Sequence, residues 1–84
     1  MPVDSDGLLS RITVNQEILG GKPIIRGMRL SVAMILELLA KGAAMQEILE
    51  DYPELEMADI QASLLYAHHL MENEEIFERV ASWR

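Results

Sequence analysis

The chain has 84 residues, half of them apolar and none of them cysteine, so we expect one small domain in a reducing cytoplasm, without disulfide bonds or thiolate metal sites. Its formal net charge of −7 is divided unevenly, because residues 1–41 sum to +1 and residues 42–84 sum to −8. An acidic surface repels phosphate, so any nucleic-acid contact is expected in the first half. The alternative for the second half is that its acidic helices simply face water and aid solubility.

Residues 1–9 are predicted to form a flexible N-terminal tail. They include Asp4 and Asp6 and contain no long apolar run, so we expect neither a signal peptide nor a membrane span there. The rest of the chain is predicted to divide into a domain over residues 10–72 and a C-terminal arm over residues 73–84.

Two short apolar runs, separated by glycines and a proline, predict a β-hairpin. The runs are Arg11-Ile12-Thr13-Val14 and Pro23-Ile24-Ile25. Cations gather on this ribbon, and they are the candidate nucleic-acid-binding residues: Arg11, Lys22, Arg26 and Arg29. The alternative is that Arg26 and Arg29 pair with Glu17, Glu37 or a helix carboxylate and hold the hairpin in place.

Three helices are predicted after the hairpin, from apolar residues spaced i, i+3, i+4 and i+7. The first begins after the N-cap Ser31 and ends at Gly42. The second begins at Met45 and is ended by Pro53. The third has the expected core stripe Met57, Ile60, Leu64, Ala67 and Met71. The predicted fold class is mainly α: a three-helix, helix-turn-helix-like bundle with a short N-terminal β-hairpin and a C-terminal helical extension.

The third helix is a poor candidate for reading DNA. Residues 57–71 contain no Lys or Arg, and Glu54, Glu56 and Asp59 lie near its start. Insertion into the major groove is therefore not favoured, although Gln61 has the chemistry to pair with adenine.

The arm over residues 73–84 continues the third helix or breaks from it near Asn73. Its apolar face is the candidate partner-binding surface, made of Ile76, Phe77, Val80 and Trp83. Folding back onto the core and contact with another chain both remain open.

The sequence contains no recognisable catalytic, cofactor-binding or metal-binding constellation. His68 and His69 point about 100° apart on a helix, and His68 with Glu72 supplies only two possible ligands. The run Gly20-Gly21-Lys22-Pro23 lacks the P-loop spacing. We expect a protein that acts by binding and not as an enzyme.

Glycines, prolines and apolar residues follow one another in a specific combination: Gly20-Gly21-Lys22-Pro23, Ile25-Arg26-Gly27-Met28-Arg29, Gly42, Ile48, Tyr52-Pro53, Leu55 and Asp59-Ile60. This combination resembles the family called domain of unknown function 433, over about residues 11–67. The resemblance implies a homeodomain-like trihelical fold preceded by a β-hairpin. It also implies an antitoxin that is partnered with a PIN-like ribonuclease toxin, with its own promoter DNA as a further ligand.

The chain departs from the family pattern at several positions. It has Gly27-Met28-Arg29-Leu30-Ser31 where the family tends to have Gly-Thr-Arg-Ile-Pro, and Ala44 and Glu56 where the family tends to place Ser and Thr before helices. Losing such an N-cap hydroxyl costs about 0.5–2 kcal/mol per helix. Glu47 and Asp59 are expected to offset part of this loss through the helix dipole.

The leading functional hypothesis is a cytoplasmic, homodimeric antitoxin that neutralises a PIN-like ribonuclease toxin. One alternative is a dimeric DNA-binding transcriptional regulator that has no toxin partner. The other is a structural dimerisation module.

Overall fold

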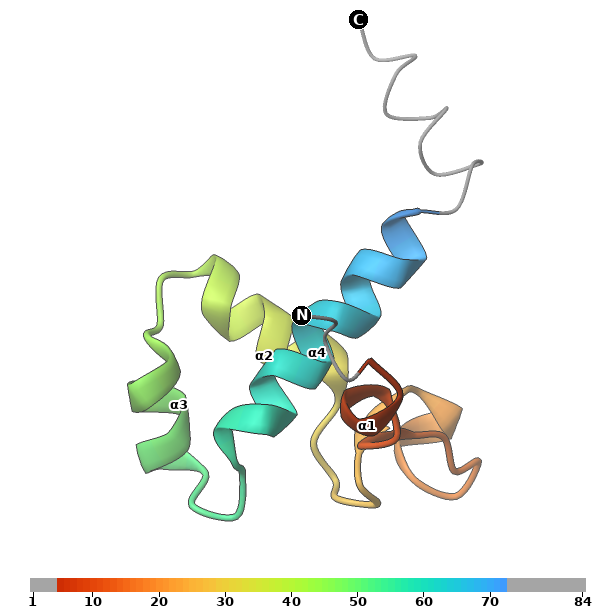
Figure 1. Ribbon diagram of the computed structural model, residues 1–84. Coiled ribbons are helices and arrows are strands. Elements are labelled where there is room, and N and C mark those ends of the chain that lie inside the picture. The colour runs from red at the N-terminus through yellow and green to blue at the C-terminus, as the bar shows by residue number, and fades with distance from the viewer. Residues whose placement is uncertain (1–4, 73–84) are drawn as a thin grey trace, which may run out of the picture.

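The computed structural model describes residues 5–72 (Figure 1). In that part the fold is mainly helical with a short antiparallel hairpin near the N-terminus, which confirms the predicted fold class. The elements in chain order are α1 (Ser5–Leu9), β1 (Ile12–Thr13), the 3₁₀ turn η1 (Leu19–Gly21), β2 (Ile24–Ile25), α2 (Val32–Ala40), α3 (Met45–Asp51) and α4 (Met57–Met71). The predicted helical extension over residues 73–84 lies outside the described residues.

Helix α4 is the element around which the others gather. It contacts α1, α2, α3 and β1, and in Figure 1 it runs between α3 on one side and α1 on the other. The core that these elements share consists of Ile25, Leu30, Val32, Ile35, Ile48, Leu55 and Ile60. Full burial of one such side chain contributes about 1.5–3 kcal/mol, so this core supplies the stability that helices of this length lack alone.

The hairpin pairs β1 with β2 in antiparallel register, Ile12 opposite Ile25 and Thr13 opposite Ile24. One more bond follows the ladder, from the N–H of Arg26 to the carbonyl of Arg11 at 2.8 Å. Strands of two residues are marginal by themselves. Ile24 and Ile25 are fully buried, so packing against the rest of the domain holds the hairpin together.

The chain reverses after β2 through Arg26 and Gly27, whose φ angles are both positive, at 43° and 77°. The N–H of Met28 donates to the carbonyl of Ile25 at 2.6 Å, which closes a turn of type I′ character. A left-handed conformation costs roughly 1–2 kcal/mol for a residue other than glycine. Arg26 must therefore be held in place by contacts of its side chain.

Helix α1 lies in the segment for which the sequence predicts a flexible tail. Its residues Leu8 and Leu9 are half-buried, and the helix packs against α4. The hydroxyl of Ser10 donates to the carbonyl of Gly7 at 2.8 Å at its end. Five residues are too few to show a helical period, so this helix depends on its tertiary contact with α4.

Helix α2 begins and ends as the sequence predicts. The hydroxyl of Ser31 accepts a bond from the N–H of Met34 at 3.0 Å, which is the N-cap contact. At the other end Gly42 has a φ of 100° and donates to Leu39, while the N–H of Ala43 donates to Leu38, both at 3.0 Å. These two bonds form a Schellman motif, in which glycine is the favoured residue.

Helices α3 and α4 begin without a capping hydroxyl, because their N-cap residues are Ala44 and Glu56. The carboxylate of Glu47 instead accepts from the N–H of Ala44 at 2.7 Å, and that of Asp59 accepts from the N–H of Glu56 at 2.8 Å. Each carboxylate supplies one half of a capping box. Their contribution is therefore a hydrogen bond to the helix start, in addition to the expected interaction with the helix dipole.

Candidate functional site

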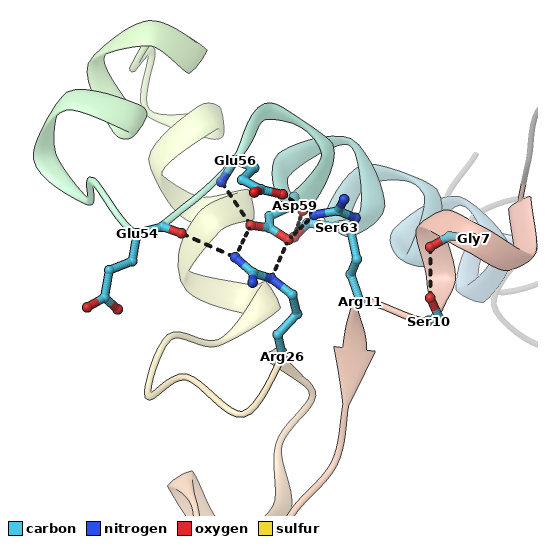
Figure 2. Close-up of polar contacts among 8 residues, drawn as sticks. All are labelled: Gly7, Ser10, Arg11, Arg26, Glu54, Glu56, Asp59 and Ser63. Atoms are coloured by element: carbon cyan, nitrogen blue, oxygen red, sulfur yellow. Dashed lines mark hydrogen bonds and ion pairs between the residues drawn. The ribbon is translucent and has the colours of Figure 1, made fainter.

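Polar contacts between distant parts of the chain meet at Asp59, in the first turn of α4 (Figure 2). This carboxylate has an exposed fraction of 0%. Arg26 reaches it from the turn after β2, and Arg11 reaches it from the residue before β1. Arg11 and Arg26 lie opposite each other, so the cluster ties both strands, at the open end of the hairpin, to the central helix.

The hydrogen bonds of Asp59 use its full capacity as an acceptor. Arg26 binds it through two atoms, with Nε donating to Oδ1 at 3.0 Å and Nη2 to Oδ2 at 2.8 Å. Arg11 donates from Nη1 to Oδ1 at 3.0 Å and to Glu56 Oε1 at 2.7 Å. The backbone N–H of Glu56 is the fourth donor to Asp59. An ionised carboxylate has about four acceptor sites, so Asp59 has none left for a metal ion or a substrate.

The cluster favours the charged forms of Asp59, Arg11 and Arg26. Burial alone would raise the pKa of Asp59, but hydrogen bonds from Arg26, from the backbone of Glu56 and from Arg11 outweigh it and lower the pKa below its ordinary value. The pKa of Arg11 is raised chiefly by its bond to Glu56, and that of Arg26 by its bond to Asp59. Two guanidinium groups thus face two carboxylates, and the cluster as a whole is electrically neutral.

Two of the four candidate nucleic-acid-binding cations, Arg11 and Arg26, belong to this cluster. Their side chains retain exposed fractions of 28% and 39%. Both are engaged with carboxylates, so they attract phosphate less than free cations would. The stated alternative for Arg26, pairing with a helix carboxylate, is what the structure contains.

The other two candidate cations, Lys22 and Arg29, are exposed. Within residues 5–72 neither of them forms an ion pair or a hydrogen bond through its side chain. Glu37, one of the expected arginine partners, instead pairs with Lys41 at 2.9 Å, four residues along α2. Binding of nucleic acid by any of the four cations stays a prediction.

Comparison with known protein families finds a match to the segment that contains the hairpin and most of the helices. The family described as a protein of unknown function, DUF433, matches residues 12–67. The chain belongs to the DUF433 family. This confirms the resemblance that the sequence motifs predicted.

Two relatives support the assignment. The uncharacterised protein y4eO of Sinorhizobium fredii is 34% identical over 56 residues, which are 67% of this chain and 25% of that protein. The chain thus spans about a quarter of the length of this curated relative. The crystal structure of a DUF433 member protein from Anabaena variabilis has a TM-score of 0.66 and 28% identity, over 90% of this chain and 73% of that one.

Within the matched DUF433 segment, the buried role of Asp59 was missed by sequence reasoning. The sequence assigned Asp59 an interaction with the helix dipole and a repulsion of DNA, and it left the helix carboxylate that pairs with Arg26 unnamed. The signal was its helical phase, because Asp59 shares a face of α4 with Ile60 and Ser63, which are also fully buried. An acidic residue on the apolar face of a helix indicates a cationic partner.

The core stripe predicted for α4 was wrong at three of its five positions. Ile60 is fully buried, but Met57, Leu64 and Met71 have exposed fractions of 42%, 40% and 53%. The buried face of α4 consists instead of Asp59, Ile60, Ala62 and Ser63. On this face Asp59 forms its ion pairs with the hairpin arginines, which are tertiary contacts that apolar spacing alone could not reveal.

The remaining DUF433 features offer little chemistry. A groove of about 360 Å³ between α2 and α3 is lined by Leu38, Lys41, Gly42, Ala43, Glu47, Ile48 and Asp51. His68 and His69 approach Glu72 at 3.4 and 3.8 Å, and no group of three or more potential metal ligands occurs within residues 5–72.

No helix in the described part of the chain is long and apolar enough to cross a membrane. The candidate partner-binding residues Ile76, Phe77, Val80 and Trp83 lie outside the described residues.

Proposed function

We propose that this DUF433 protein is a cytoplasmic antitoxin that acts by binding, without catalysis, and neutralises a PIN-like ribonuclease toxin. The toxin class rests on the family resemblance. The mode of binding rests on charge: exposed carboxylates gather on α3 and the turn that follows it, and the cations beside them are Lys41 at the groove and Arg26 at the backbone of Glu54.

Residues 42–72 contain seven carboxylates and no Lys or Arg. Glu56 and Asp59 are engaged with arginines of the hairpin. Four of the others are exposed on or next to α3: Glu47, Glu50, Asp51 and Glu54. We call these four residues the acidic face.

A ribonuclease must attract the phosphates of RNA, so its substrate-binding surface is basic. An acidic face complements such a surface, steers the encounter and competes with the substrate. The neutralised cluster around Asp59 supports the same interpretation, because it removes two cations that would repel a basic partner.

The proposal is tested by expressing the tagged chain together with the protein encoded beside its gene. We expect a basic ribonuclease to co-elute in stoichiometric amount and to be inactive while it is bound. Reversing the charge at Glu50, Asp51 and Glu54 to Lys should weaken the complex at least tenfold in a calorimetric titration, and it spares Glu47, which caps α3. Glu17→Lys is the matched control, because Glu17 is equally acidic and exposed but lies near the hairpin.

Two results would contradict the proposal. One is a chain that elutes without a partner, and the other is an affinity that the reversed acidic face leaves unchanged. The same titration tests the sequence-based prediction that replacing Phe77 and Trp83 by Ala weakens the complex.

The second candidate function is a dimeric DNA-binding regulator, which includes binding to its own promoter. One observation supports it: Lys22 and Arg29 are exposed and carry no ion pair within residues 5–72. Replacing both by Ala should then lower promoter affinity and reduce its salt dependence by about two counterions. Arg26→Ala is not a clean test, because it also breaks the contact with Asp59. A native protein that shifts no DNA at low salt would reject this function.

A further inference from the structure

A row of exposed residues runs along α4 on the side away from its buried face. Its members alternate in spacing between four and three residues: Met57, Gln61, Leu64, His68 and Met71. We call this row the α4 stripe. Its three apolar side chains have exposed fractions of 40% to 53%, and they account for half of the six large exposed hydrophobic side chains among the described residues.

The α4 stripe is electrically unusual for this protein. Residues 60–71 contain no Asp, Glu, Lys or Arg, although the whole chain carries a net charge of −7. Two copies of an acidic protein repel each other least where the facing surfaces lack charge. A basic partner, by contrast, is drawn to the acidic face and gains no electrostatic attraction from this stripe.

The α4 stripe is also symmetric about its centre. Leu64 lies midway along α4, seven residues from Met57 and seven from Met71, with the polar residues Gln61 and His68 between them. A surface that has the same order of residue types in both directions can pair with itself around a two-fold axis.

We infer that a second copy of this chain docks on the α4 stripe, with the two α4 helices antiparallel and a two-fold axis beside Leu64. Leu64 then packs on Leu64 of the second copy, and Met57 packs on Met71 of the second copy. Gln61 lies opposite His68 of the second copy, where an amide and an imidazole can form a hydrogen bond. This inference does not rest on the proposed function.

The contact follows a helix of 15 residues, about 22 Å long at ~1.5 Å per residue. That length places it at the small end of stable interfaces, so we expect a dimer whose population rises with concentration. Its stability comes from apolar burial, and added salt should not weaken it as it weakens an ion-paired interface.

The oligomeric state of the full chain tests this docking surface. We expect sedimentation velocity to show a concentration-dependent dimer of the wild-type protein. Leu64→Glu should shift the midpoint to at least tenfold higher concentration, because it places two carboxylates at the two-fold axis. Val14→Glu is the matched control, since Val14 is exposed to 59% but lies at the hairpin, and it should leave the equilibrium unchanged. Circular dichroism of both variants checks that the fold is retained.

A cross-linking experiment tests the geometry even if Leu64→Glu fails to fold. The chain has no cysteine, so a single Leu64→Cys substitution reports on one position only. Under mild oxidation it should form a disulfide-linked dimer much faster than Val14→Cys at the same concentration, because a disulfide requires closely apposed β-carbons.

The inference is overturned by a protein that remains monomeric up to millimolar concentration. It is also overturned by a dimer that Leu64→Glu and Val14→Glu affect equally, or by equal rates of cross-linking at the two positions. None of these results bears on toxin binding through the acidic face, so the two proposals fail separately.

Discussion

Asp59 stabilises the protein through two kinds of contact at once. Its carboxylate pairs with Arg11 and Arg26 of the hairpin, and it accepts the N–H of Glu56 at the start of α4. The same pairing offsets the left-handed backbone of Arg26, whose φ is 43°. A single side chain thus connects a strained turn, a short hairpin and the central helix.

Asp59→Asn should lower the free energy of unfolding by about 2–4 kcal/mol, because it leaves Arg26 without its anion and Arg11 with Glu56 alone. Urea denaturation followed by circular dichroism measures this loss. Glu37→Gln is the control, since it breaks an exposed ion pair with Lys41 that contributes less than about 1 kcal/mol. Equal effects of the two substitutions would show that burial of Asp59 adds nothing.

Because the pKa of Asp59 is lowered by folding, the free energy of unfolding should depend on pH in a defined direction. Its pKa is lower in the folded protein than in the unfolded chain, so the unfolded chain binds more protons as the pH falls. The contribution of Asp59 is complete above about pH 5 and is lost as the pH falls through its folded-state pKa, which lies below the ordinary value near 4. Urea midpoints between pH 3 and 7 should therefore decline more steeply for the wild type than for Asp59→Asn. Parallel curves would contradict the assigned cause.

At the scale of the elements, the sequence predicted those helices whose ends are encoded locally. Ser31 and Gly42 mark the ends of α2, and Pro53 follows α3 closely, because capping and glycine or proline geometry act within a few residues. Helix α1 was not predictable, since its packing on α4 is a tertiary contact. The rotation of α4 escaped prediction for the same reason, because the ion pairs of Asp59 with the arginines of the hairpin are tertiary contacts.

The start of α3 offers a direct test of capping. Ala44→Ser should raise the free energy of unfolding by about 0.5–1 kcal/mol, because a hydroxyl at the N-cap adds a hydrogen bond to the first turn. Ser31→Ala should lower it by about 0.5–2 kcal/mol, since Ser31 caps α2 in this way. Chemical denaturation of the two variants checks both signs, and a loss of stability in Ala44→Ser would contradict the capping argument.

At the scale of the whole molecule, charge and apolar surface occupy different places. The acidic face lies on and next to α3, whereas the α4 stripe carries no ionised carboxylate or cation between residues 60 and 71. The candidate site was only partly predictable at this scale. Composition located the carboxylates in the second half of the chain, but the neutralisation of Arg11 and Arg26 required the folded arrangement.

This separation predicts that self-association and partner binding are independent. Leu64→Glu should weaken the dimer at least tenfold and leave the affinity for the basic partner within about twofold, because distant sites contribute additively. Reversing the charge of the acidic face should weaken partner binding and leave the dimer unchanged. Light scattering and calorimetry on both variants measure the two properties, and a partner affinity that falls with the loss of the dimer would show that the surfaces overlap.

The most direct test of the proposed function is a calorimetric titration of this chain with the protein encoded beside its gene, at low and high salt. We predict a stoichiometric complex whose affinity decreases as salt screens the acidic face. Substitution of Lys for the carboxylates of the acidic face should weaken this complex. No binding at low salt, or an affinity that neither salt nor the charge reversal changes, would contradict the proposed function.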